Sequence, residues 1–474
     1  MLTHLYNTQE SHIPYSKNAP VNYHNGVFLL MVKDGAKTNY SPRALLYDFR
    51  GGFGALNKYE YFEQPVSDQT PLSDPYFAAN TPPPKNQYQT NLDKGIINNQ
   101  GLLNVDNTKY WSDYNRLIYS PRSLKTLESF QYPGHHKHFS NLKFNNYKVG
   151  LEEFSNHPDE LDNFRYFLEQ CDHFQGLQCT VDVDSGWGGY SNLMLTDIVD
   201  EYFNNNNKIN LWVYGLIDNE PSKSVIQTIS RIKSIVELGK HSSLFFPISP
   251  SYNSSLLTSS FNNSSDWHTS ALSAIFINGL WNSINQINST NMGVIEDNLL
   301  RGQDRKFVNE IKITSYKASD SMVSDVDISA YYNVYGNVDN TVPEPKTESI
   351  SLYGSSKNNE HSTYFARNYI KKPLQDLELP TDGVVNTYEC DSMNDIVSVD
   401  SFPDILSSQD YSLEFHVSSA FKGTLKEYKK TVQNVRPHFS QLMDLMEDKY
   451  ELIEDIGKLV EDYTEGYDES DDED

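Results

Sequence analysis

The stretch "CTVDVDSGWGGYSNLMLTDIVDEY", Cys179–Tyr202, joins an alternating apolar run to a glycine-rich turn and then to an amphipathic segment. The alternation predicts a strand over Gly176–Asp184, and the apolar spacing that follows predicts a helix over Tyr190–Phe203. The glycines would then lie at the carboxyl end of a strand and the amino end of a helix, where backbone N–H groups favour an anion. We therefore treat Asp184–Gly189 as a candidate phosphate-binding loop.

Strand and helix signals alternate on both sides of this loop. Asp159–Cys171 has apolar residues at helical spacing, and Ile209–Leu216 is a nearly continuous apolar run typical of a buried strand. Nearer the start, Arg43–Phe49 is a short strand pattern that ends in the glycine turn "RGGFG". The order of helix, strand, glycine loop, helix and strand predicts an α/β fold with a parallel sheet and crossover helices.

Polar, Pro-, Asn- and Ser-rich segments predict long surface loops or linkers at Gln64–Thr90, Ser249–Trp267 and Asn337–Glu348. A helix is predicted over Asp266–Trp281, beginning at the very end of the second of these segments.

The carboxyl end of the chain has a different pattern. Tyr411–Ser419 predicts a strand, Leu425–Val435 a helix, and Phe439–Val460 a second helix with an apolar stripe that suits core packing. An acidic tail, residues 461–474, follows this helix directly. We therefore expect truncation after Val460 to leave the folded body intact. Truncation before Phe439 should expose the surface that the second helix covers and cause aggregation.

Four short motifs stand out: "YDFRGGFG" at Tyr47–Gly54, "YWSD" at Tyr110–Asp113, "PRS" at Pro121–Ser123 and "DSGWGG" at Asp184–Gly189. Together they resemble the Misato family of tubulin-like proteins, and Leu168–Tyr202 is similar to the tubulin stretch that holds the glycine-rich signature. The resemblance is specific over roughly the first 205 residues and depends on the order of elements beyond them.

The resemblance implies a tubulin-like α/β fold and a cellular role. The implied divisions are a parallel-sheet, nucleotide-binding-type domain over 1–248, an intermediate α/β domain over 267–420, carboxyl-terminal helices over 421–460 and a disordered acidic tail over 461–474. The implied function is the partitioning of mitochondria and the inheritance of mitochondrial DNA, in a protein associated with mitochondria and also cytoplasmic. Its implied partners are proteins of the mitochondrial surface, cytoskeletal factors or chaperonin factors.

The resemblance also implies a nucleotide site for GTP with Mg²⁺. The residues that would hold the nucleotide are Asp184, Ser185, Gly186, Gly188 and Gly189. We expect a positive φ at Gly188 or Gly189, where a β-branched residue would be strained. No catalytic residue and no metal ligand is predicted.

Three features depart from the tubulin pattern. Trp187 and Tyr190 place bulky aromatic groups at the tip of the loop, where tubulins have small residues. Asp182 and Asp184 would bring carboxylates toward the polyphosphate, at a cost of about 4 kcal/mol for a contact near ~4 Å unless Mg²⁺ bridges the charges. The opening "MLTHLYNTQES" resembles the helix after the first strand and loop of tubulins, so we expect either an upstream segment that encodes that strand or a partly lost nucleotide site.

Charge and composition exclude several classes of function. The formal charge of −26 argues against direct nucleic-acid binding, because phosphate backbones are held by Lys and Arg. Residues 461–474 carry nine acidic side chains and no basic one, which is typical of a solvated tail or of a segment that recruits a basic partner. No run approaches the ~20 apolar residues of a membrane span.

Two further patterns are candidate metal or disulfide sites. His135, His136 and His138 follow a Pro-Gly turn, a setting more typical of a solvated loop than of a metal site. The three cysteines have no spacing that suggests zinc or a disulfide framework. The sequence therefore favours a non-enzymatic tubulin-like protein that acts through protein partners, and the alternative is a GTP-binding, polymerising cytoskeletal GTPase.

Overall fold

The structure of the protein is a computed structural model. The residues that it describes are 1–13, 29–34, 37–56, 83–96, 99–120, 122–139, 141–157, 161–172, 174–203, 209–218, 224–286, 290–316, 347–354, 362–373, 375, 379–380, 383–436 and 440–464. Most of the loop predicted over Gln64–Thr90, almost all of that over Asn337–Glu348, and tail residues 465–474 lie outside these ranges.

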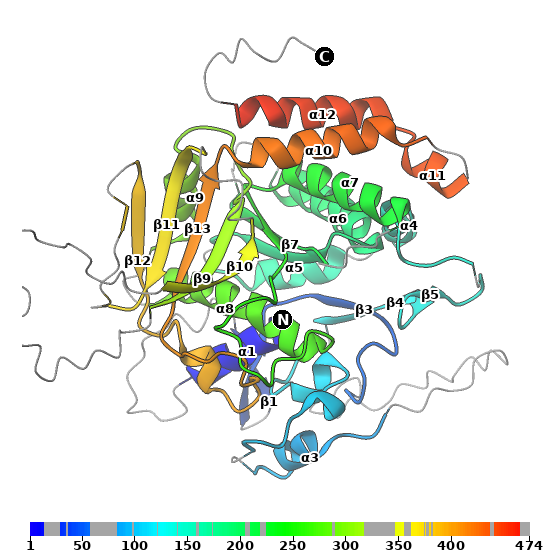
Figure 1. The fold of residues 1–474 in the computed structure, drawn as a ribbon. Coiled ribbons are helices and arrows are strands. Elements are labelled where there is room, and N and C mark those ends of the chain that lie inside the picture. Colours follow the sequence, from blue (N-terminus) through cyan, green and yellow to red (C-terminus); the bar gives the residue numbers. More distant parts are fainter. Residues whose placement is uncertain are drawn as a thin grey trace, which may run out of the picture.

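Helices and strands alternate through the described chain (Figure 1). The strands are β1 (Leu29–Asp34), β2 (Lys37–Pro42), β3 (Leu46–Arg50), β4 (Leu124–Gln131), β5 (His135–His136), β6 (Leu177–Asp182), β7 (Leu211–Leu216), β8 (Leu244–Ile248), β9 (Glu310–Tyr316), β10 (Thr347–Tyr353), β11 (Tyr364–Lys371), β12 (Val385–Glu389) and β13 (Ser412–Ser418). The helices are α1 (Leu2–Ser11), α3 (Gln87–Asp93), α4 (Tyr147–Ser155), α5 (Leu161–Glu169), α6 (Gly186–Tyr202), α7 (Val225–His241), α8 (Asp266–Asn285), α9 (Met292–Leu300), α10 (Phe421–Asn434), α11 (Ser440–Leu445) and α12 (Lys449–Asp462), with short 3-10 turns η1 (Val105–Asn107), η2 (Trp111–Tyr114) and η6 (Asp395–Ser398).

The predicted parallel sheet is formed by β6, β7 and β8, in that order. Helix α6 connects β6 to β7, and α7 connects β7 to β8. The central strand is apolar because both of its faces are covered, and Leu211, Trp212 and Val213 have no exposed surface. Among the described residues, β6 pairs only with β7, and the additional strand expected from the resemblance stays a prediction.

Two smaller sheets lie beside this one. Strand β3 pairs in parallel with β4, which pairs with β5, and β1 pairs with β2 as an antiparallel hairpin. The strand predicted over Arg43–Phe49 is therefore confirmed as β3, and its glycine turn follows at Gly51–Gly54, where Gly51 has φ +85° and Gly54 has φ +56°. Positive φ explains why glycine occupies these two positions.

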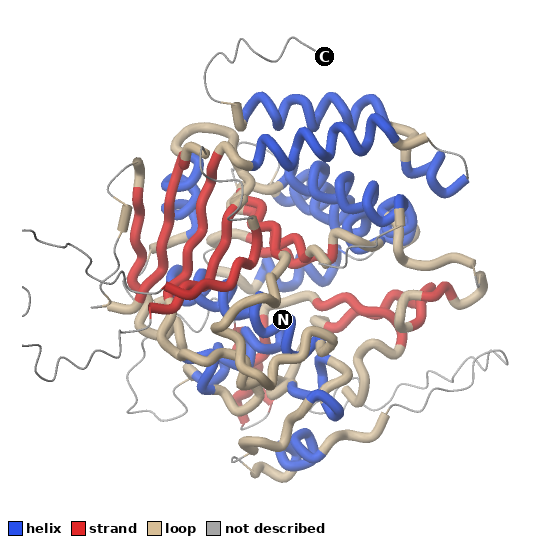
Figure 2. Tube along the Cα trace, viewed as in Figure 1, coloured by secondary structure: helices blue, strands red, loops and turns tan. Residues whose placement is uncertain are grey.

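A five-stranded sheet, in the order β10-β9-β13-β11-β12, forms the other side of the molecule (Figures 1 and 2). Its strands pair antiparallel except for β11 with β12. Its central strand β13 confirms the strand predicted over Tyr411–Ser419. The alternation of sheets and helices over the described chain gives the α/β architecture that the motifs imply.

Helix α8 lies between the parallel β6-β7-β8 sheet and the five-stranded sheet, and nearly all of its sides are buried. Seventeen of its 20 residues are buried, including Phe276 and Leu280, so its hydrophobicity cannot be restricted to one face. Apolar contacts run without a break from β7 through α8 to β13 and on to α12. The divisions predicted at 248 and 420 therefore share one continuous core.

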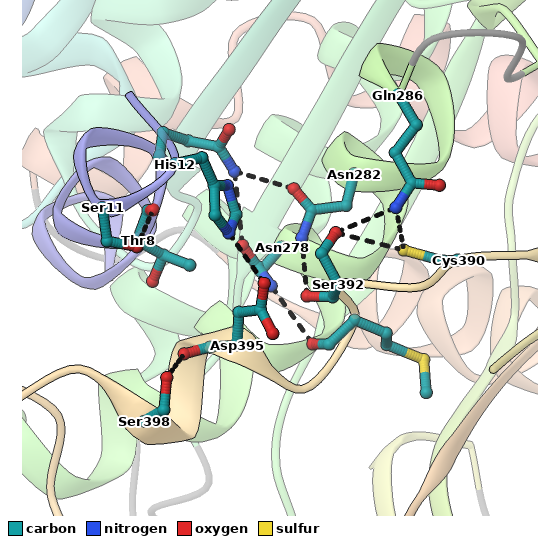
Figure 3. Close-up of polar contacts among 12 residues, drawn as sticks. Thr8, Ser11, His12, Asn278, Asn282, Gln286, Cys390, Ser392, Asp395 and Ser398 are labelled. Carbon is teal, nitrogen blue, oxygen red and sulfur yellow. Dashed lines mark hydrogen bonds and ion pairs between the residues drawn. The ribbon is translucent and has the colours of Figure 1, made fainter. Parts of the chain in front are cut away.

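A buried polar seam joins α1 to α8 and to the chain that follows β12 (Figure 3). Gln9 Nε2 donates to Asn282 Oδ1 at 2.9 Å, and Asn282 Nδ2 donates to the Ser392 carbonyl at 3.1 Å. One turn away, Gln286 Nε2 donates to Ser392 Oγ at 3.0 Å, and His12 pairs with Asp395 at 3.0 Å. Because buried amides need partners, this seam fixes how α1 sits on α8.

The carboxyl-terminal helices differ from the prediction in two places. The helix predicted over Phe439–Val460 is divided into α11 and α12 by a turn after Leu445. The acidic tail predicted from residue 461 begins later, because α12 continues to Asp462 and Tyr463 has no exposed surface. The Tyr463 ring packs 5.2 Å from Phe421, and its hydroxyl accepts the Phe307 N–H at 2.9 Å.

Of the helices in the described ranges, none is both long and apolar enough to cross a membrane.

Candidate functional site

The candidate loop lies where the sequence predicts it. Strand β6 ends at Asp182, and α6 begins at Gly186 with Ser185 as its N-cap. The Ser185 hydroxyl accepts the Trp187 N–H at 3.4 Å. The helix thus starts four residues earlier than Tyr190, so Gly186, Gly188 and Gly189 form the first turn of α6 rather than a separate loop.

The expectation of a positive φ at Gly188 or Gly189 is wrong, since neither is among the glycines with positive φ. The residues are glycine because neighbouring helices pass close to them. A Cβ on Gly189 would lie 1.9 Å from the Tyr147 carbonyl oxygen, and one on Gly188 would lie 2.0 Å from Ser234 Oγ. In return, a Cβ on Gly150 of α4 would lie 1.6 Å from the Gly186 carbonyl oxygen. The glycines of α6 and α4 therefore allow the two helix backbones to touch.

The first N–H groups of α6 already have partners in the chain. The Gly186 N–H donates to the Phe144 carbonyl at 3.1 Å, and the Gly188 N–H donates to the Ser185 carbonyl at 3.4 Å. With Trp187 N–H directed to Ser185 Oγ, three of the N–H groups that an anion at this helix start would use are engaged within the protein.

The two aromatic side chains at the tip of the loop turn into a small core. Trp187 packs against Phe49 and Phe144, with ring centroids 5.1 and 5.0 Å apart. Tyr190 is 2% exposed and packs against Phe154 at 5.1 Å. These rings pack α6 against the β3-β4 sheet. They therefore belong to the core and do not project from the tip of the loop.

Asp184 is bound by a cation that no sequence motif indicates. Arg231 of α7 pairs with both carboxylate oxygens, through Nε to Oδ1 and through Nη2 to Oδ2, the second contact at 3.0 Å. The Asp218 N–H also donates to Asp184 Oδ2 at 2.7 Å, and Arg231 Nη2 donates to the Asp218 carbonyl at 3.0 Å. The expectation that Asp184 presents an uncompensated charge to a phosphate is therefore wrong.

The other predicted carboxylate, Asp182, also has a local role. Its Oδ1 accepts the Asp184 N–H at 2.9 Å, which closes the turn between β6 and α6.

Two of the motifs contact each other at the end of β3. Trp111 Nε1 donates to Asp48 Oδ2 at 3.1 Å, and the Phe53 and Trp111 rings meet edge to face at 5.7 Å. A Cβ on Gly54 would lie 2.7 Å from the Tyr110 ring. Burial raises the pKa of Asp48, against the effect of hydrogen bonds from Phe49 and Trp111. The motifs "YDFRGGFG" and "YWSD" thus pack together as one unit.

The three histidines lie on and just after β5. His136 Nδ1 accepts the N–H groups of His138 and Phe139, each at 3.1 Å, so this ring closes a turn. Within the described ranges, no group of three or more His, Cys, Asp or Glu side chains is arranged to hold a metal ion.

Comparison with known proteins gives matches over the whole chain. Residues 1–94 match the Misato Segment II tubulin-like domain, and residues 101–282 match a tubulin domain. Protein DML1 of Scheffersomyces stipitis is 42% identical over 100% of this chain and 96% of its own length. Protein DML1 of Debaryomyces hansenii is 41% identical over 99% of this chain and 95% of its own, and that of Candida albicans is 35% identical over 100% and 97%.

Proposed function

This chain belongs to the Misato family of tubulin-like proteins, and from this membership we propose that it acts in the partitioning of mitochondria and the inheritance of mitochondrial DNA. In this proposal the protein works through protein partners and does not turn over nucleotide. It associates with mitochondria and is also present in the cytoplasm. Its direct partners are mitochondrial-surface, cytoskeletal or chaperonin proteins.

One observation favours a non-enzymatic role: polar groups at the start of α6 and in the turn before it already have partners within the protein. The Gly186 N–H is bound to Phe144, and the Asp184 carboxylate is bound to Arg231 and to the Asp218 N–H. A phosphate at this turn would have to displace these contacts. A single net hydrogen bond contributes about 1 kcal/mol, and contacts to charged groups contribute more.

A nucleotide titration tests this proposal most directly. Purified protein is titrated with fluorescent GTP in the presence and absence of Mg²⁺, and phosphate release is followed in parallel. We expect no saturable binding at micromolar nucleotide. Mg²⁺-dependent binding with turnover would instead support the alternative, a GTP-binding, polymerising cytoskeletal GTPase.

The cellular role is tested by depletion and rescue. Depletion should fragment or cluster mitochondria and reduce the transmission of their DNA, and the wild-type chain should restore both. Ser185→Ala should rescue equally well, because the Ser185 hydroxyl has only a 3.4 Å contact to Trp187 N–H and no nucleotide to hold in this proposal. Normal mitochondrial shape and inheritance after full depletion would refute the role, and failure of a stably folded S185A chain would argue for a bound phosphate.

A further inference from the structure

Helix α10 presents basic side chains on the surface of an acidic protein. From Phe421 to Arg436 the chain carries five cations and a single carboxylate, Glu427, although the net charge of the whole chain is −26. Lys426 and Lys430 are exposed and lie four residues apart, which places them on the same face of the helix. We call these two residues, with the half-buried Lys422 and Lys429 beside them, the α10 lysine face.

The described chain ends beside this face. Helix α12 packs on α10 in the opposite direction, so that Lys449 at its start binds the Gln433 carbonyl at 2.9 Å and Tyr463 at its end packs against Phe421. Figure 1 shows the two helices side by side along their length. The described chain therefore ends at Thr464, one residue after Tyr463, near the first turn of α10.

The tail has the charge and the length to cover the lysine face. Residues 465–474 carry seven carboxylates in ten positions and no basic side chain. An extended chain of ten residues spans up to ~33 Å, whereas 14 helical residues rise only ~21 Å. The tail could therefore follow α10 along its whole length, so no second copy of the chain is required to bring the two together.

We propose that the α10 lysine face is a binding surface for acidic peptide segments and that the protein's own tail, residues 465–474, occupies it in cis. The contact is between exposed charges, so it weakens as salt rises. A partner with an acidic segment reaches the lysine face only by displacing the tail. This inference is independent of the proposed mitochondrial role.

The test uses full-length chains and a fluorescent peptide with the sequence of residues 465–474. In a tail-neutral chain the seven tail carboxylates are replaced by amides: E465Q, D468N, E469Q, D471N, D472N, E473Q and D474N. Anisotropy titrations at low salt should show that the peptide binds this chain at least about tenfold more tightly than it binds the wild type. Equal affinity for the two chains, or no binding to the tail-neutral chain, would overturn the proposal.

Charge reversal locates the surface. Lys426→Glu/Lys430→Glu in the tail-neutral background should raise the peptide Kd by about tenfold or more. The matched control is Lys94→Glu/Lys109→Glu, which changes the net charge equally at two exposed positions far from α10 in sequence. An equal loss in both double variants would mean non-specific attraction and would overturn the proposal. If the wild-type chain dimerises and the tail-neutral chain does not, the cis arrangement is overturned. Unchanged melting temperatures of the variants exclude unfolding as the cause of a weaker peptide affinity.

Discussion

Arg231 of α7 donates hydrogen bonds to both carboxylate oxygens of Asp184, the first residue of the glycine-rich turn. Arg231 Nη2 lies 3.0 Å from Asp184 Oδ2. The two residues are 47 positions apart in the sequence. Their pairing ties the end of β6 to α7 and, through the Asp218 main chain, to the end of β7. The carboxylate side chain is 6% exposed and the guanidinium side chain is 22% exposed, so the pair is largely shielded from water.

The ion pair between Asp184 and Arg231 predicts that substitutions of its two residues lower the free energy of unfolding by different amounts. Arg231→Met leaves a buried carboxylate without its cation and should lower the free energy of unfolding by on the order of 3 kcal/mol. Asp184→Asn should cost less, because the guanidinium that remains is closer to water and the amide oxygen can still accept the Asp218 N–H. Urea unfolding of the two single variants and of the double variant measures the difference. Equal costs for the two single variants, with full additivity in the double, would contradict the pairing.

The contact between α4 and α6 predicts how glycine substitutions behave. Gly189→Ala and Gly150→Ala each push a methyl group into a backbone carbonyl and should each cost about 1–3 kcal/mol. Gly423→Ala in α10 is the control, because a Cβ there meets no atom within 4 Å, and it should be neutral or stabilise by up to ~1 kcal/mol. Thermal unfolding checks all three. A tolerated alanine at 150 and 189 would disprove the close helix contact.

The sequence predicted the elements around the loop because their patterns are local. Val181 and Val183 alternate with polar residues, and the order of strand, turn and helix needs no knowledge of distant residues. The sequence pattern places the start of α6 too late, because Gly186, Gly188 and Gly189 have low helix propensity and carry no apolar stripe. Close packing against α4 overrides that propensity.

The partners of the loop could not be predicted in the same way. Arg231 belongs to the next crossover helix, and nothing in its local sequence distinguishes it from a solvated basic residue. The same holds for the polar seam, where Asn278 and Asn282 of α8 lie within an otherwise apolar helix and find partners on α1 and after β12. Their amides find hydrogen-bond partners between 110 and 273 residues away in the sequence, and local periodicity carries no information about such distant contacts.

The burial of His4 predicts a loss of stability in mild acid. His4 is 1% exposed, its Nε2 donates to the Trp267 carbonyl at 3.2 Å, and burial lowers its pKa well below the usual value of 6.5. Below pH 6.5 the unfolded chain therefore binds a proton at this position that the folded chain does not, so stability falls as pH drops from 6.5 toward the lowered pKa.

His4→Gln should reduce this slope by up to about 1.4 kcal/mol per pH unit, since it removes one titrating group. Urea unfolding at pH 7, 6 and 5 measures the slopes. The exposed His138→Gln is the control and should leave the slope of the wild type unchanged. If H4Q and the wild type lose stability in parallel, His4 is not the group that responds.

Tyr463 decides where the tail can be removed. Its ring has no exposed surface and packs against Phe421, and its hydroxyl accepts the Phe307 N–H at 2.9 Å and donates to the Phe307 carbonyl at 3.2 Å. A chain that ends after Val460 loses this residue together with the acidic tail, so the burial of Tyr463 argues against the expectation that this truncation leaves the folded body intact. That chain should be less stable by about 3–5 kcal/mol, as for other buried aromatic residues that are removed.

At high salt, where the exposed charges of the tail are screened, a chain that ends after Thr464 should melt like the full-length protein, because it keeps Tyr463 and loses only residues 465–474. Full-length Tyr463→Ala should reproduce most of the loss seen after truncation at Val460, which would assign the effect to the ring and not to the missing charge. Tyr463→Phe keeps the ring and should cost only about 1 kcal/mol for the lost hydrogen bonds. If removal after Thr464 destabilises the protein as much as removal after Val460, then the acidic residues support the fold and Tyr463 is not the anchor.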